Sequence, residues 1–220
     1  FYFHPQPDQK AVEKKKQAAP SGKIIVLESR EISDPSLKNY LEKRKIPLAV
    51  ASLFCKEILF ELYGKKLLAI GFKNNSGGYE LRSQNFKGSS TPKEPLLITG
   101  NDKKDLAVFE GFFSFLSFIS FQQSENSKKI ELPEVQTGFL ILNSISFFEK
   151  SRELMERFDR IHLFLDRDKM GLKCTSDALT WSKKYVDQSH CYKGYKDLND
   201  CLVDSFKMEE KQSTGKRKRL

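Results

Sequence analysis

A short apolar run that ends in two aspartates constrains the fold of this chain more than any other feature. Residues 161–165 are Ile-His-Leu-Phe-Leu, and Asp166, Asp168 and Gly171 follow them. A run of this length between charged residues is typical of a strand buried inside a parallel sheet. Ligands of open α/β sheets collect at the carboxyl ends of the strands, which is where these two carboxylates would lie.

Two interpretations of the aspartate pair are open at this point. Two carboxylates one residue apart offer only oxygen ligands, and these suit a hard cation such as Mg²⁺. Alternatively, an Asp after a strand caps the N-terminus of the helix that follows. Because short motifs recur by chance, Asp-x-Asp on its own favours the capping role.

A second acid follows another apolar run. Residues 106–109 are Leu-Ala-Val-Phe, and Glu110 and Gly111 come directly after them. The Phe-rich segment that continues to Phe121 is apolar on nearly every face. We therefore expect a helix that is buried all round, with its Phe side chains in the core. Glu110 would lie at a strand end, as Asp166 does.

A third apolar run, residues 138–142, lies between the two acidic stretches and ends in Asn143 and Ser144. We expect an amphipathic helix over 145–158 after it. At the strand end, Asn143 would orient water, a metal ion or a phosphate; alternatively, Ser144 caps the next helix. The order along the chain is strand, Glu-Gly and helix, then strand and helix, then strand, Asp-x-Asp-x-x-Gly and helix.

This order of elements and acids resembles the Toprim domain, the metal-binding catalytic fold of bacterial replicative primases, type IA and type II topoisomerases and some nucleases. Glu110 matches the invariant glutamate of the family, and Asp166 and Asp168 match its Asp-x-Asp pair. The resemblance covers residues 95–206. It implies an α/β Toprim fold, with a mostly parallel four-stranded sheet flanked by helices. It also implies that the three acids are catalytic and bind Mg²⁺ or Mn²⁺.

Residues 23–94 are expected to form a smaller α+β lobe before this domain. Apolar spacing and turn residues predict a strand over 23–29, helices that begin at Pro35 and run over 48–56, and a hairpin over 57–72.

This lobe resembles the amino-terminal subdomain of the bacterial primase catalytic core. The match rests on Gly77-Gly78-Tyr79, on Arg82 and on Phe86-Lys87-Gly88. It implies that a basic groove lies beside the Toprim acids, and it favours primases over other Toprim proteins.

The whole chain looks like the primase-like Toprim proteins of Bacteroides-type mobile elements, without the zinc-ribbon module that often precedes the core. Gly-Gly-Tyr-Glu-Leu-Arg and the Lys-Asp-Leu-Asn-Asp segment at 196–200 recur in those proteins. By this resemblance Asp197 is a further metal ligand and Asn199 contacts nucleotide or nucleic acid. Alternatively, Asp197 caps a helix and Asn199 lies in its first turn. Ser114 stands where the family often has Asp, which leaves open whether one ion or two are bound.

Three cations are candidates for contacts with the phosphates of a template or a nucleotide: Arg82, Lys87 and Lys93. Arg82 is the strongest, because its planar fork suits bidentate phosphate contact. The alternative is a solvated strand face. Tyr79 and Phe86 lie among these cations and would either stack on bases or pack in the core.

Composition agrees with a nucleic-acid partner. The 220 residues carry a net charge of +9, which indicates a polyanionic partner. The four cysteines lack metal-ligand spacing, so we expect reduced thiols in a cytoplasmic protein.

We recognise no signal peptide and no apolar run long enough to cross a bilayer, and so expect no membrane association. Residues 1–22 are expected to be a linker and residues 207–220 a disordered basic tail.

The sequence therefore predicts a primase-like nucleotidyltransferase that makes short primers on single-stranded DNA from nucleoside triphosphates. A helicase or another replication protein is the expected further partner. Two alternatives stay open: a Toprim nuclease that uses the same acids to activate water, and a nucleic-acid-binding module without catalysis. A topoisomerase is not favoured, because a domain with a nucleophilic tyrosine does not fit in this length.

Overall fold

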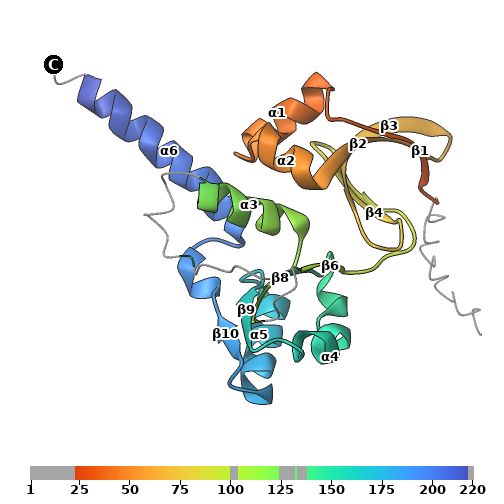
Figure 1. Cartoon of the computed structure of the whole chain (residues 1–220). Coiled ribbons are helices and arrows are strands. Elements are labelled where there is room, and N and C mark those ends of the chain that lie inside the picture. The colour runs from red at the N-terminus through yellow and green to blue at the C-terminus, as the bar shows by residue number, and fades with distance from the viewer. Residues whose placement is uncertain (1–22, 100–103, 124–131, 133–137, 218–220) are drawn as a thin grey trace, which may run out of the picture.

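The structure is a computed structural model that describes residues 23–99, 104–123, 132 and 138–217, with side chains described as far as Met208. It contains two five-stranded sheets (Figure 1). The linker expected over residues 1–22 lies outside the described residues.

The first sheet is antiparallel, with its strands in chain order. Its strands are β1 (Ile25–Arg30), β2 (Cys55–Leu62), β3 (Lys65–Lys73), β4 (Tyr79–Ser83) and β5 (Phe86–Ser89). Two helices, α1 (Pro35–Lys43) and α2 (Leu48–Phe54), lie between β1 and β2 along the chain. The predicted hairpin is confirmed: Tyr63 and Gly64 both have positive φ, the geometry that a two-residue turn between β2 and β3 requires.

The second sheet has the strand order β10-β9-β7-β8-β6. Its strands are β6 (Leu96–Thr99), β7 (Asp105–Phe109), β8 (Gly138–Ile141), β9 (Arg160–Phe164) and β10 (Tyr185–Asp187). The four strands from β7 to β10 are parallel, as predicted. The fifth strand, β6, is an addition to the prediction, and it pairs antiparallel with β8 at the edge.

Four helices accompany the second sheet: α3 (Phe112–Gln123), α4 (Arg152–Met155), α5 (Lys169–Trp181) and α6 (Leu198–Arg217). The single helix expected over 145–158 is wrong, because this segment forms the short 3₁₀ helices η2 (Ile145–Phe147) and η3 (Glu149–Ser151) before α4. Serine, isoleucine and phenylalanine at its start are weak helix formers, which favours short 3₁₀ turns there.

The end of the chain also differs from the prediction. β10 ends at Asp187, and the next residues form the 3₁₀ helix η4 (Ser189–Tyr192). α6 runs to Arg217, so the disorder expected from residue 207 onward is wrong for 207–217. Lys, Glu, Gln and Met are good helix formers, and here they extend a helix that Leu198 and Leu202 anchor in the core.

The largest apolar core joins the two parts of the molecule, and α3 lies at its centre (Figure 1). The Phe112 ring stacks on Phe72 of β3 at 5.2 Å, and the Phe115 ring meets Phe54 of α2 at 4.8 Å. On the other side of α3, Phe118 meets Phe164 of β9 at 5.1 Å. The predicted core role of these Phe side chains is thus confirmed.

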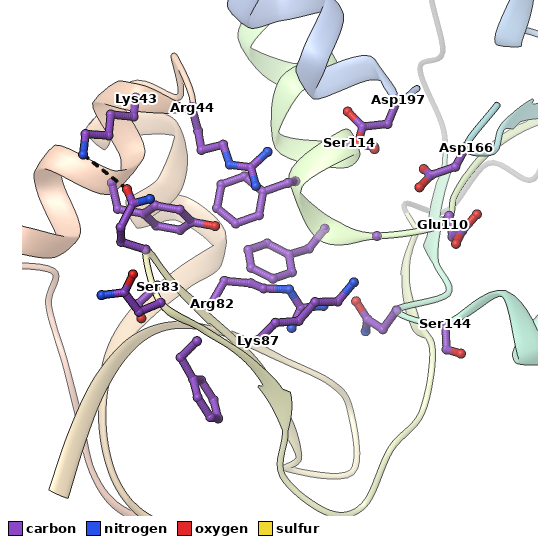
Figure 2. Close-up of a pocket in the computed structure, with 18 of the residues that line it drawn as sticks. Lys43, Arg44, Arg82, Ser83, Lys87, Glu110, Ser114, Ser144, Asp166 and Asp197 are labelled. Atoms are coloured by element: carbon purple, nitrogen blue, oxygen red, sulfur yellow. Dashed lines mark hydrogen bonds between the residues drawn. The ribbon is translucent and has the colours of Figure 1, made fainter. Parts of the chain in front are cut away.

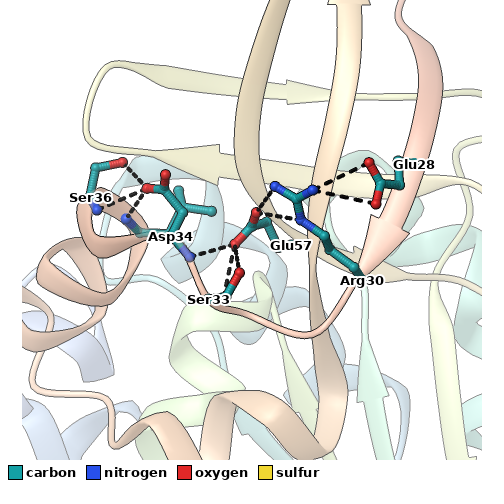
Figure 3. Close-up of polar contacts among 7 residues, drawn as sticks. Glu28, Arg30, Ser33, Asp34, Ser36 and Glu57 are labelled. Carbon is teal, nitrogen blue, oxygen red and sulfur yellow. Dashed lines mark hydrogen bonds and ion pairs between the residues drawn. The ribbon is translucent and has the colours of Figure 1, made fainter.

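A buried carboxylate fixes the connection between β1 and α1. Glu57 of β2 is fully buried and accepts hydrogen bonds from Arg30 Nε at 2.8 Å and from the backbone amides of Ser33 and Asp34 at 2.9 and 2.7 Å (Figure 3). Burial opposes its charge, but these bonds prevail and hold the pKa of Glu57 below its usual value. The start of α1 is therefore anchored to the first sheet.

His162 is buried in β9, and its Nδ1 lies 3.0 Å from Gln188 Nε2. All four cysteines lie in the described residues, and none of them forms a disulfide. No helix in the described part of the chain is long and apolar enough to cross a bilayer.

Candidate active site

A pocket of about 890 Å³ lies between the two parts of the molecule (Figure 2). On one side are four cations from α1 and from β4 and β5, which we call the basic wall: Lys43, Arg44, Arg82 and Lys87. On the opposite side are three carboxylates from the second sheet and the start of α6, which we call the acidic wall: Glu110, Asp166 and Asp197.

Sheet register brings two of the acids together. Phe109 pairs with Phe164 in the parallel strands β7 and β9, so Glu110 and Asp166 leave neighbouring strands at the same edge. The backbone amide of Asp166 donates a hydrogen bond to the Glu110 carboxylate. Asp197 reaches the same pocket from the segment that precedes α6.

The carboxylates of the acidic wall disfavour one another's charge. Burial, Glu110 and Asp197 together raise the pKa of Asp166 to about 7. Burial and the charge of Asp168 raise the pKa of Glu110 as well. Lys196 opposes both shifts, but does not cancel them. Such a group of acids is stabilised by a cation among them.

Asp168 caps the helix that follows it, and its role as a metal ligand stays a prediction. Its Oδ1 accepts hydrogen bonds from the backbone amides of Met170 and Gly171, both at 3.0 Å, so it is the N-cap of α5. It does not line the pocket, although its charge acts on Glu110. Asp168 thus anchors the loop that carries Asp166.

The donor set fits a hard cation only in part. Glu110 Oε2 is buried without a hydrogen-bond partner, and every candidate ligand is an oxygen. Within the described ranges, however, no three Asp, Glu, His or Cys side chains converge as a complete ligand set. Mg²⁺ in proteins usually binds one or two carboxylates and completes its octahedron with water and substrate phosphates. The acidic wall fits that arrangement, in which Glu110 and Asp166 would be the protein ligands.

Arg82 lies in the basic wall, but much of its hydrogen-bonding capacity is used within the protein. Its Nη1 lies 2.9 and 3.0 Å from the carbonyl oxygens of Leu81 and Gly88 and 3.2 Å from Glu80 Oε2. The Arg82 and Glu80 side chains are only 15% and 11% exposed. Burial lowers the pKa of Arg82 and raises that of Glu80. Arg82 is therefore less available to a ligand than its position in the sequence predicts.

Lys87 is more available to a ligand than Arg82. It is exposed, lines the pocket and has no hydrogen bond or ion pair with any residue that the structure describes. Its charge also acts on Glu110, across the pocket. Lys93, by contrast, is exposed outside the pocket, where its charge acts on Glu80.

The two candidate asparagines differ in position. Asn143 follows β8 with φ of 62°, lines the pocket, and keeps its Oδ1 buried without a partner. Asn199 does not line the pocket, because its buried amide bonds to Arg44 and Ser117.

The aromatic candidates belong mainly to the core. Tyr79 is buried, and Phe86 packs on Phe60 with ring centroids 4.8 Å apart, although Phe86 also borders the pocket. Sequence reasoning missed Lys43 and Arg44, which lie at the end of α1 and line the pocket.

Comparison with known proteins identifies the class of fold. Residues 107–202 match the family described as Toprim-like, and residues 26–91 match a domain of unknown function, DUF8464. No curated protein matches the chain.

Two solved structures are similar. One is the crystal structure of the primase fragment of the bacteriophage T7 primase-helicase protein, with a TM-score of 0.50 and 17% identity, covering 91% of this chain and 81% of that one. The other contains the bacteriophage T7 lagging-strand DNA polymerase interacting with primase domains bound to an RNA/DNA hybrid and dTTP. Its TM-score is 0.45 at 16% identity, covering 84% of this chain and 90% of that one. The predicted fold class is thus confirmed: the chain is a mixed α/β protein with a Toprim-like domain, and its fold is similar to that of the primase fragment.

Proposed function

We propose that this protein is a primase-like nucleotidyltransferase that joins nucleotides into short primers on single-stranded DNA. One observation carries the proposal: carboxylates at the carboxyl edge of the Toprim-like sheet face a wall of cations across one pocket. Phosphoryl chemistry needs both, because cations hold the triphosphate while acids hold a divalent metal ion.

Each wall has a distinct task in this mechanism. Glu110 and Asp166 would hold Mg²⁺ or Mn²⁺, with Asp197 close by. The bound ion would supply the charge that activates a primer 3′-hydroxyl and steadies the departing pyrophosphate. Lys87 of the basic wall would bind phosphate oxygens of the ligand. Arg82, in the same wall, would add positive charge next to Lys87.

Asn143 is suited to orienting a ligand at the edge of the acidic wall. Its Oδ1 is a buried acceptor without a partner, so a water molecule or a hydroxyl of the substrate would satisfy it. This extends the role proposed from its place at the end of a strand.

Two other functions use the same residues. A Toprim nuclease would place water, in place of a 3′-hydroxyl, beside the acidic wall. A binding module would keep the basic wall and lack catalysis, and Ser114 in the pocket is the feature that favours it. DNA, nucleotides and a helicase or another replication protein are the partners we propose, in the cytoplasm.

The decisive experiment is incubation of the protein with labelled nucleoside triphosphates and single-stranded DNA, with and without Mn²⁺. Oligomers longer than the added nucleotide support the primase. Shortened template supports the nuclease, and binding without either product supports the inactive module. Ribonucleotides and deoxynucleotides are supplied in separate reactions, so that the preferred class is identified.

Metal binding is expected to be weak without nucleotide and much tighter with it. The acidic wall provides too few ligands for an octahedron, so triphosphate oxygens must complete the coordination. We expect calorimetric titration with Mn²⁺ to give at least about tenfold higher affinity when a non-hydrolysable triphosphate is present. Tight binding of two ions to the protein alone would contradict this, as would a Zn²⁺ requirement for catalysis.

Lys87→Ala is expected to weaken binding of single-stranded DNA and to reduce its salt dependence. Loss of one phosphate contact lowers the slope of log affinity against log salt by about 0.7 for a single strand. Lys65→Ala, which removes an exposed charge at the turn between β2 and β3, is the matched control and should leave the slope unchanged. Equal slopes for both variants would mean that Lys87 does not contact the strand.

A further inference from the structure

Asn199 connects three helices through one buried amide. Its side chain lies at the start of α6 and is 1% exposed. Asn199 Oδ1 accepts a hydrogen bond from Arg44 Nη1 at 2.9 Å, and its Nδ2 donates to the Arg44 carbonyl oxygen at 2.9 Å. Nδ2 also lies 2.9 Å from Ser117 Oγ in α3. Arg44 and Asn199 are 155 residues apart in sequence.

These bonds hold one edge of a guanidinium that borders the pocket. The Arg44 guanidinium carbon lies 5.7 Å from the ring centre of Tyr40 and 5.3 Å from that of Phe113. Its Nη1 is bound to Asn199, and the Arg44 side chain extends toward the pocket (Figure 2). Two aromatic rings and one amide therefore fix the guanidinium, while its other N–H groups remain for a ligand.

The place of Asn199 in α6 gives this arrangement a second consequence. Asp197 of the acidic wall lies two residues before Asn199 and directly before the first residue of α6. The amide thus ties Arg44 of the basic wall to the N-terminus of α6, next to Asp197. A shift of α6 would move one residue on each side of the pocket.

We propose that Asn199 is a positioning residue that holds Arg44 in the basic wall, and that Arg44 binds a phosphate group of the ligand. The proposal rests on the proposed function for the nature of the ligand, whose phosphates belong either to a nucleoside triphosphate or to a DNA backbone. Asn199 itself touches neither. This replaces the direct nucleotide contact that its place in the sequence suggested.

The test compares variants that remove different hydrogen bonds of the same amide. Asn199→Ala removes the bonds to both Arg44 and Ser117. Ser117→Ala leaves the bonds to Arg44 in place and removes the bond to Asn199, together with the bond that Ser117 Oγ donates to the Phe113 carbonyl oxygen. Arg44→Lys keeps the charge but loses the planar fork that Asn199 holds. Two probes are titrated at low salt in Mg²⁺: a non-hydrolysable nucleoside triphosphate and a thymidine oligonucleotide.

We expect Asn199→Ala and Arg44→Lys to weaken binding of one probe by about tenfold, the size of one charge-assisted hydrogen bond. The probe that weakens identifies the source of the phosphate. Ser117→Ala should lower the melting temperature and leave both affinities unchanged. If Asn199→Ala does not fold, Arg44→Lys and Ser117→Ala together decide the question.

Two results overturn the inference. One is equal affinity of wild type and Arg44→Lys for both probes, which would leave Arg44 without a phosphate contact. The other is equal loss of affinity in Asn199→Ala and Ser117→Ala, which would make Asn199 a general support of the helices. Failure of the proposed function would give a different result. If the wild-type protein bound phosphate but made no primers, priming would be refuted, and the positioning role of Asn199 would still hold.

Discussion

Asp166→Asn is expected to abolish primer synthesis and yet leave the protein at least as stable as wild type when metal is chelated. Asp166 lies in the acidic wall beside Glu110 and Asp197. Burial and both neighbours disfavour its charge, so a neutral side chain of the same shape relieves repulsion. The same change removes a metal ligand. We expect a loss of activity of about a thousandfold, the upper range for one electrostatic group.

The measurements are thermal unfolding in chelator and primer synthesis in Mn²⁺. Asp177→Asn is a matched control, because Asp177 pairs with Lys173 on the exposed side of α5, outside the pocket. This control should retain synthesis. A clear drop in the melting temperature of Asp166→Asn in chelator would instead assign Asp166 a structural role.

The strands and the acids at their ends were predictable because the signal is local. The apolar runs at 106–109, 138–142 and 161–165 are contiguous, and parallel strands place their carboxyl ends at one edge. Convergence of Glu110 and Asp166 follows from this alone.

The ion pair between Arg82 and Glu80 was also predictable from the sequence. Glu80 and Arg82 are two residues apart in a strand, so their side chains point to the same face. Their ion pair follows from that spacing. Lys87, at a more exposed position in β5, keeps its charge available to the pocket.

The basic wall as a whole was not predictable, because it depends on contacts between distant segments. Arg44 lies at the end of α1, and its contacts with Asn199 and Phe113 hold it at the pocket. One sequence gives no sign of such a pair. The apolar character of α3 predicted burial, but not that Phe112 would pack on the first sheet.

Asp168 shows how one motif serves two purposes. The sequence left capping and metal binding as alternatives, and its Oδ1 caps α5. Because this cap anchors the end of the loop, it holds Asp166 in place, and the carboxylate of Asp166 lines the pocket. The spacing of the Asp-x-Asp pair therefore reflects the geometry of the loop as well as that of the proposed metal site.

Gly171→Ala is expected to have the largest effect on stability of any small substitution near the pocket. A Cβ at Gly171 would lie 2.0 Å from the Asp166 carbonyl oxygen and 2.9 Å from its carbonyl carbon. These are backbone atoms of a capped loop, so the clash with the new Cβ is relieved only if α5 and the loop move apart. We expect a loss of about 3 kcal/mol in the free energy of unfolding, the upper range for overpacking.

The same substitution should also impair metal binding, because relief of the clash moves Asp166 away from Glu110. Gly111→Ala is the control for stability, since its Cβ would meet no atom within 4 Å among the described residues beyond its own chain neighbours. Its free energy of unfolding should stay within about 0.5 kcal/mol of wild type. We would measure denaturant unfolding of all three proteins. Mn²⁺ binding would be titrated for wild type and Gly171→Ala, in both cases in the presence of a triphosphate. If Gly171→Ala matched wild type in both, α5 would not pack against the Asp166 loop as closely as the structure requires.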